Sequence, residues 1–211
     1  MGIRFTEATL EFLAQAPFQG REWVAHNRAV YQAEVVEPQR ALAEAMAGFM
    51  AGMEPGLEPS LSRIYRDARF SRGPALHESI WVTFQDRDIA PEERPAFCFE
   101  LYPDRWRALM GFYSAGRSIM ERIRRRIDAD PLRFLALVGA LPPGYRVMGE
   151  TYKVSRAGHL PEAVRTWYDR KSFWVEDLRP IDELVLGARL PRHLEEQFAL
   201  LHPLYRFVRE A

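Results

Sequence analysis

The chain has 211 residues, of which 47% are hydrophobic and 12% are aromatic, and its formal net charge is zero. This length suits one large domain or two small ones, and the composition is sufficient for a well-packed core. The balanced charge argues against a general nucleic-acid-binding protein, which usually carries a strong positive excess. We expect no membrane span, no signal peptide and, with Cys98 as the single cysteine, a cytoplasmic protein without an internal disulfide.

The N-terminal quarter of the chain predicts helices. Thr6 is a suitable N-cap, so we predict a first helix over residues 7–16 that ends at Pro17. A second helical stretch should cover residues 20–50, and Pro38 should kink or restart it because proline lacks the N–H that a helix interior needs.

The central part of the chain predicts strands. Residues 52–59 resemble a linker by their glycine and proline content, and residues 61–67 suggest a strand, although the arginine spacing there also permits a helix. Apolar and polar residues alternate over 79–85 and 96–102, and a third strand is expected over 108–114. The connections are too short for a crossover helix, so these strands should be antiparallel neighbours.

The C-terminal half mixes both kinds of element. We predict an amphipathic helix at 117–128, followed by a helix with Asp130 as N-cap and Pro131 at its start. A strand at 145–153, a short helix at 161–168 and a strand at 171–175 should follow. The chain should close with a helix that is kinked near Pro203. The order of elements predicts a single α+β domain over residues 1–211, in which a mainly antiparallel sheet is packed by several helices.

An arginine-rich segment is the most informative motif in the sequence. Residues 63–72 hold four arginines and one aspartate interleaved with Ile64, Tyr65 and Phe70. This aromatic and aliphatic content suggests partial burial, and partly buried guanidinium groups need partners. The segment therefore predicts an anion site in which Arg63, Arg66 and Arg69 bind a phosphate or carboxylate and Asp67 orients them.

The same arginines also fit a structural interpretation. Asp67 could pair with a neighbouring arginine, and Glu22 or Glu100 could reach the cluster, so that all charges are satisfied inside the protein. The sequence leaves both interpretations open. A third, a hydrolase-type enzyme, would have only Asp67 as a nominated residue, and whether the chain is an enzyme stays undecided.

Other candidate residues have weaker signals. Trp23 could stack on a ligand, but a tryptophan on a long helix more often belongs to the core. The chain has only two lysines, Lys153 and Lys171, which could bind phosphate or could be ordinary surface residues. Cys98 lies between Phe97 and Phe99 and fits a packed thiol.

Several common functional signatures are missing from the sequence. The five histidines show no metal-ligand spacing, and there is no GxSxG motif, no glycine-rich phosphate loop and no GxGxxG motif. We therefore expect no metal and no cofactor. Residues 122–126 are the most basic run, but the same helix carries acidic residues and an apolar face, so we interpret the run as a solvated surface and expect no nucleic-acid partner.

Three stretches together resemble the uncharacterised family called domain of unknown function 2461. They are the run Arg21-Glu22-Trp23 with His26, Tyr31 and Pro38, the central run Arg63 to Ser71, and Lys153 with the later run Arg170-Lys171-Ser172-Phe173. The chain departs from the family pattern at residues 72–79, where a lysine- and tyrosine-containing run is replaced. The resemblance implies a family and no established activity.

The sequence as a whole predicts a protein that binds a small phosphate- or carboxylate-bearing ligand. The proposed binding residues are Arg63, Arg66, Asp67, Arg69, Trp23, Lys153 and Lys171. The alternative is a structural or interaction protein whose arginines form an internal salt-bridge network. The oligomeric state is left open.

Overall fold

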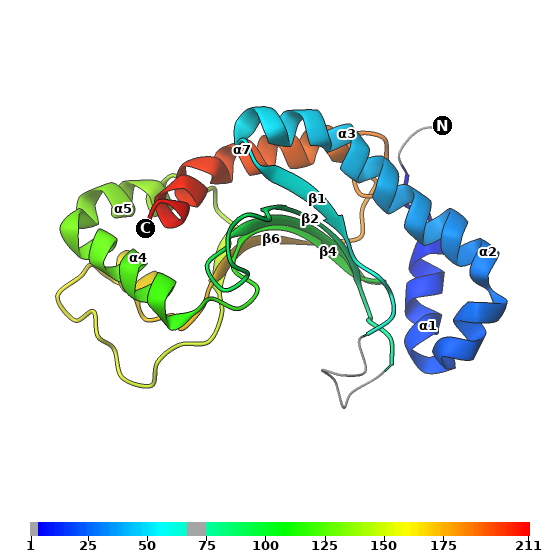
Figure 1. Cartoon of the computed structure of the whole chain (residues 1–211), viewed down its shortest axis with the longest axis horizontal. Coiled ribbons are helices and arrows are strands. Elements are labelled where there is room, and N and C mark those ends of the chain that lie inside the picture. Colours follow the sequence, from blue (N-terminus) through cyan, green and yellow to red (C-terminus); the bar gives the residue numbers. More distant parts are fainter. Residues whose placement is uncertain (1–3, 67–74) are drawn as a thin grey trace.

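A six-stranded antiparallel sheet forms the centre of the protein, with its strands in the order β1-β2-β3-β4-β6-β5 (Figure 1). The structure is a computed structural model that describes residues 4–66 and 75–211. The strands are β1 (Leu57–Leu61), β2 (Ile80–Asp86), β3 (Ala96–Leu101), β4 (Arg105–Gly111), β5 (Arg146–Met148) and β6 (Trp174–Pro180). The predicted α+β class is confirmed.

Helices precede the sheet, follow β4 and close the chain. They are α1 (Glu7–His26), α2 (Arg28–Val30), the π-helix η1 (Tyr31–Val36), α3 (Glu37–Met53), α4 (Arg117–Ala129), α5 (Pro131–Gly139), α6 (Glu162–Tyr168) and α7 (Leu190–Arg209). The predicted N-caps are confirmed at two helix starts, because Thr6 accepts a hydrogen bond from the Thr9 N–H and Asp130 accepts one from the Arg133 N–H.

The hydrophobic core lies between one face of the sheet and two helices. Figure 1 shows a strongly curved sheet with α3 and α7 over its convex side. Alternate residues of β2 and β3 point to that side, where Phe97 lies 5.2 Å from Phe198 and 4.7 Å from Tyr205 of α7, measured between ring centroids. Because side chains alternate along a strand, the intervening residues must lie on the concave side.

The first helix differs from its prediction at Pro17. Pro17 lies inside α1, and the break comes at Gly20, which has φ 86° and ψ −175°. A positive φ of this size is readily available only to glycine, so the backbone turns there. The prediction that Pro38 kinks or restarts the helix corresponds to the π-helix η1: Pro38 lies in the first turn of α3, directly after η1, where the hydrogen-bond pattern changes.

The strand boundaries correct several predictions. The expected linker at 52–59 overlaps β1, which contains Pro59. Because β1 is an edge strand, proline removes no essential ladder bond there. Of the described part of the strand expected at 61–67, only Leu61 belongs to a named strand, but Tyr65 forms an isolated antiparallel bridge with Leu76. Strand β4 begins three residues earlier than predicted, and β6 covers 174–180 instead of 171–175.

No helix in residues 4–66 and 75–211 combines the length and the apolar character that crossing a bilayer requires.

Candidate functional site

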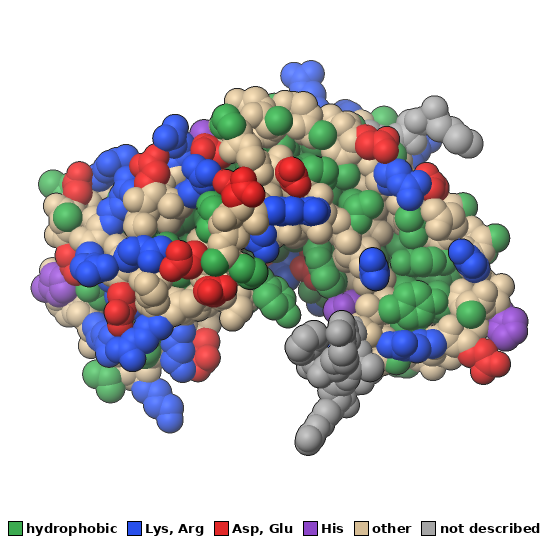
Figure 2. Space-filling view, in the orientation of Figure 1, with side chains coloured by type: hydrophobic (Ala, Val, Ile, Leu, Met, Phe, Trp, Pro, Cys, Tyr) green, Lys and Arg blue, Asp and Glu red, His purple; other side chains and the backbone are tan. Residues whose placement is uncertain are grey.

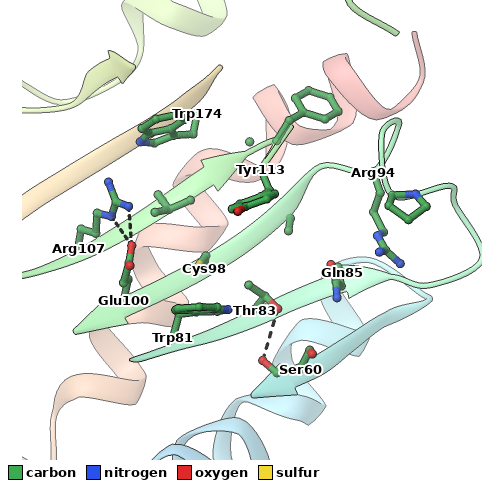
Figure 3. A pocket seen from close by; sticks show the side chains of 15 residues that line it. Ser60, Trp81, Thr83, Gln85, Arg94, Cys98, Glu100, Arg107, Tyr113 and Trp174 are labelled. Carbon is green, nitrogen blue, oxygen red and sulfur yellow. Dashed lines mark hydrogen bonds and ion pairs between the residues drawn. The ribbon is translucent and has the colours of Figure 1, made fainter. Parts of the chain in front are cut away.

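The concave side of the sheet holds a cavity of about 540 Å³. Figure 2 shows the molecule hollowed between its two ends on this side, and Figure 3 shows the side chains around the cavity. The cavity is lined by Ser60, Trp81, Thr83, Gln85, Pro91, Arg94, Ala96, Cys98, Glu100, Arg107, Leu109, Gly111, Phe112, Tyr113 and Trp174.

Strand register explains why these residues meet. Trp81 pairs with Glu100, and Glu100 pairs with Arg107, so these three form one row across β2, β3 and β4. A second row runs from Thr83 through Cys98 to Leu109 and then to Glu176 on β6. Paired residues in antiparallel strands present their side chains on the same face, so each row lines the cavity floor.

A buried charge network occupies one end of the floor. The Arg107 Nε donates to Glu100 Oε2 at 2.7 Å, and its Nη1 donates to Glu176 Oε2 at 2.6 Å. Ser79 Oγ also donates to Glu100, and Trp174 Nε1 donates to Glu176. Burial alone would lower the pKa of Arg107, but the attraction and hydrogen bonds of Glu100, together with Tyr102 and Glu176, raise it above its ordinary value.

Aromatic side chains form the walls. Trp81 and Trp174 are half-buried, whereas the side chain of Tyr113 is fully exposed. In Figure 3 the Tyr113 ring lies over the middle of the floor, between the two ends. Large aromatic rings usually bury most of their area against the protein, so an uncovered ring beside a cavity is available for stacking.

Arg94 marks the end of the cavity opposite the charge network, near Gln85 (Figure 3). Arg94 is half-buried, and no carboxylate of residues 4–66 and 75–211 lies within ion-pair distance of it. Its guanidinium therefore differs from that of Arg107, which is neutralised by two glutamates.

Cys98 lies on the floor rather than in the core. Its neighbours Phe97 and Phe99 point to the helix-covered side, while Cys98 faces the cavity and is only 8% exposed. Burial, with a smaller contribution from Glu100, raises the pKa of the Cys98 thiol far above its ordinary value. The thiol is therefore packed, as predicted, and burial disfavours the thiolate form that a nucleophile needs.

The arginine motif is only partly described. Asp67 and Arg69 lie outside the described residues. Arg63 is exposed, and the Arg66 carbonyl accepts a hydrogen bond from Arg21 Nη2 at 2.9 Å. The Arg66 Nε is buried and has no hydrogen-bond partner among residues 4–66 and 75–211.

His77 connects this motif to the cavity. Its ring meets the edge of Trp81 at 4.8 Å between centroids. The pKa of His77 is lowered by burial and by the charge of Arg66, against an opposing effect of Glu100. The backbone N–H of His77 donates to the Ile64 carbonyl at 2.8 Å, so the described part of the motif lies beside the Trp81 wall of the cavity.

The remaining sequence candidates lie elsewhere. Trp23 packs against Phe12 at 5.1 Å between ring centroids and against the core, which fits the structural interpretation. Lys153 is exposed, and Lys171 forms an ion pair with Glu150. None of these three residues lines the cavity.

Most residues of the cavity could not be identified from the sequence pattern. The alternation in β2 and β3 did place Trp81, Cys98 and Glu100 on a face opposite to the phenylalanines. The pattern did not indicate that this face is open, because both faces carry large side chains. Arg107 and Trp174 become neighbours only through the pairing of β4 with β6, which depends on tertiary structure.

Over the described part of the chain, residues 4–66 and 75–211, no three His, Cys, Asp or Glu side chains lie close enough together to hold a metal ion.

One comparison with known proteins gave a match. The sequence model of a family described as "Conserved hypothetical protein (DUF2461)" matches residues 8–207. The search of curated proteins found no match.

Proposed function

The chain belongs to the conserved hypothetical protein (DUF2461) family, and we propose that it binds a small molecule carrying a ring and a phosphate or carboxylate group in the concave cavity. The observation that carries this proposal is the Tyr113 side chain, which is fully exposed beside a cavity of about 540 Å³. Small-molecule sites in proteins commonly have volumes of roughly 300–1,000 Å³.

The cavity walls support a ring-bearing ligand. Trp81, Trp174 and Tyr113 surround a floor whose centre is made by Cys98 and Leu109. Flat aromatic walls above an apolar floor favour a ring that stacks on one of them. The polar groups at the two ends then fix the orientation of the ring.

Arg94 supports an anionic group at one end of the ligand. A guanidinium presents a planar fork of donors that matches carboxylate and phosphate oxygens. Arg94 has no carboxylate partner among the described residues, so a ligand anion would not have to displace a protein group. At the other end, Glu100 and Arg107 can accept from and donate to polar substituents of the ring.

The arginine motif belongs to the proposal as a second anion-binding element. Its support is the position of His77, whose ring contacts Trp81 and whose backbone N–H donates to the Ile64 carbonyl at 2.8 Å. In this proposal Arg63 and Arg66 extend the site beyond the Trp81 wall, and Asp67 and Arg69 are proposed as further ligand contacts from the sequence motif alone. The internal salt-bridge interpretation fits Arg107 better, because two glutamates hold its guanidinium.

The proposal is tested by screening phosphates and carboxylates with and without a ring for thermal stabilisation, followed by calorimetric titration of the hits. The variants are Arg94→Gln and Tyr113→Ala. Arg192→Gln is the control, because Arg192 is an exposed arginine on α7, which covers the other face of the sheet.

We expect ring-bearing anions to bind. Arg94→Gln should bind them about 10- to 100-fold more weakly, since a charge-assisted hydrogen bond contributes roughly 1.5–3 kcal/mol. Tyr113→Ala should bind them up to about tenfold more weakly, since an aromatic stacking contact contributes roughly 0.5–1.5 kcal/mol. The control should bind like the original protein. The proposal fails if no ring-bearing anion binds, or if Arg94→Gln and Tyr113→Ala both retain full affinity for every hit.

A further inference from the structure

Three cationic side chains surround the ring of Tyr152. The Cζ of Arg124 lies 5.3 Å from the ring centroid, the Cζ of Arg156 lies 4.9 Å away, and the Nζ of Lys171 lies 5.9 Å away. Each contact is within the distance at which a cation interacts with an aromatic face. Like charges gathered around one neutral ring repel one another, so the arrangement favours an anion.

Backbone pairing brings these residues together from distant parts of the sequence. The Tyr152 N–H donates to the Asp169 carbonyl at 2.9 Å, and the Lys171 N–H donates to the Glu150 carbonyl at 2.7 Å. An isolated antiparallel bridge joins Thr151 and Arg170 between them. Arg124 belongs to helix α4. The two segments that carry Lys153 and Lys171 in the sequence are thus direct neighbours.

Arg124 is a buried cation with a spare donor. Its side chain is 5% exposed, its Nε donates to the Tyr168 carbonyl at 2.9 Å, and its Nη2 donates to the Arg170 carbonyl at 2.6 Å. The remaining Nη1 is buried and has no hydrogen-bond partner in the described part of the chain. A buried donor left unpaired costs roughly 1–3 kcal/mol, and such groups often mark an unfilled interaction.

The carboxylates around the cluster form their ion pairs with other groups, although the charges of Arg124 and Arg156 add to that of Arg117 in lowering the pKa of Glu121. Lys171 is paired with Glu150, and Arg117, at the start of α4, is paired with Glu121. Asp169 accepts a hydrogen bond from the backbone N–H of Arg156. The guanidinium groups of Arg124 and Arg156 form no ion pair with any carboxylate in residues 4–66 and 75–211.

We propose that Arg124, Arg156 and Lys171 form a second binding site, for a phosphate group. Arg156 is exposed and can present its donor fork to two phosphate oxygens. Lys171 is exposed and contributes a mobile point charge, whereas Arg124 contributes a fixed buried charge. None of the four residues of this Tyr152 cluster lines the concave cavity, so the second site does not depend on the proposed function.

The test is a titration of inorganic phosphate at constant ionic strength, followed by amide chemical shifts and by calorimetry. Arg156→Gln and Lys171→Gln each remove one exposed charge from the cluster. Arg125→Gln is the matched control, because Arg125 is the exposed neighbour of Arg124 on α4 and its substitution removes the same charge. Arg94→Gln reports whether phosphate binds in the cavity instead.

We expect saturable shifts centred on residues 150–157 and 169–172, with affinity about tenfold lower in both cluster variants and unchanged in Arg125→Gln and Arg94→Gln. Lys171→Arg should restore most of the binding that Lys171→Gln loses, which separates a charge effect from misfolding. The proposal is overturned if the shifts do not saturate, if Arg125→Gln weakens binding equally, or if only Arg94→Gln does.

Discussion

At the scale of single residues, Arg107 shows how a buried charge can be structural in a cavity wall. Its side chain is 20% exposed, and its two carboxylate partners, Glu100 and Glu176, are 11% and 5% exposed at the side chain. One guanidinium thus separates two negative charges that would otherwise face each other across the sheet. Removing it leaves both carboxylates without their main partner, which is the costly way to break a buried network.

We therefore predict that Arg107→Leu lowers the free energy of unfolding by about 3–5 kcal/mol at neutral pH. Part of this loss should be regained on acidification, because two unpaired buried carboxylates bind protons more readily folded than unfolded, so that the stability difference between the variant and the original protein shrinks as pH falls. Urea unfolding at pH 7.5 and pH 5.5 measures both effects.

The control for this prediction is Arg105→Leu on the same strand. Arg105 is paired with Asp104 in a more exposed position, where ion pairs contribute less than about 1 kcal/mol. An equal loss of stability in the two variants would contradict the buried-network interpretation.

The candidate site could be predicted from the sequence only one strand at a time. Period-two alternation placed Cys98 and Glu100 opposite Phe97 and Phe99, which the structure confirms. It could not identify Arg107 as the partner of Glu100, because that contact depends on the register between β3 and β4. It also could not reveal that the Tyr113 side chain stays uncovered, since exposure is a property of the assembled fold.

At the scale of elements, β4 and β6 lie too close together at Gly111 for a side chain there. Gly111 has φ +152°, and a Cβ built on it would lie 2.4 Å from the Trp174 Cα and 2.5 Å from the Phe173 carbonyl oxygen. Both obstacles are backbone atoms, which cannot move aside as a flexible side chain can. The position of Trp174 at the cavity wall thus requires a glycine on the neighbouring strand.

We predict that Gly111→Ala lowers the free energy of unfolding by about 2 kcal/mol or more, because it combines overpacking with an unfavourable φ. Gly48→Ala is the opposite case: Gly48 lies inside α3 with nothing within 4 Å of its Cβ position, so this change should raise stability by about 0.5–1 kcal/mol. Thermal and urea unfolding of the pair measure both signs. Destabilisation by Gly48→Ala, or no effect of Gly111→Ala, would contradict the argument.

The predicted element boundaries agree with the structure where one local sequence signal dominates. The amphipathic pattern of residues 117–128 and the Asp130-Pro131 start predicted α4 and α5 closely. The boundary of β1 was wrong because Pro59 and its neighbours resemble a linker locally, whereas an edge strand tolerates proline. The helix end at Pro17 was wrong because the backbone turns at Gly20.

At the scale of the whole molecule, the curved sheet divides the titratable groups between two surroundings. Helices α3 and α7 cover the convex side, and the concave side is hollow (Figures 1 and 2). His193 of α7 meets the edge of Trp106 at 5.9 Å between centroids, and His77 meets Trp81 at the cavity. Burial, followed by a nearby arginine, lowers the pKa of both histidines below the ordinary value.

These two histidines predict an acid-sensitive fold. A histidine with a lowered pKa in the folded state binds fewer protons than it does when unfolded, so its contribution to stability is complete above its ordinary pKa and is lost as pH falls below about 6.5. Each group can contribute a slope of at most about 1.4 kcal/mol per pH unit.

The free energy of unfolding should therefore fall between pH 7 and pH 5, and His77→Gln and His193→Gln should each make that fall shallower relative to the original protein. Urea unfolding at half-unit pH intervals measures the slopes, and an unchanged slope in both buried-histidine variants would refute the assignment.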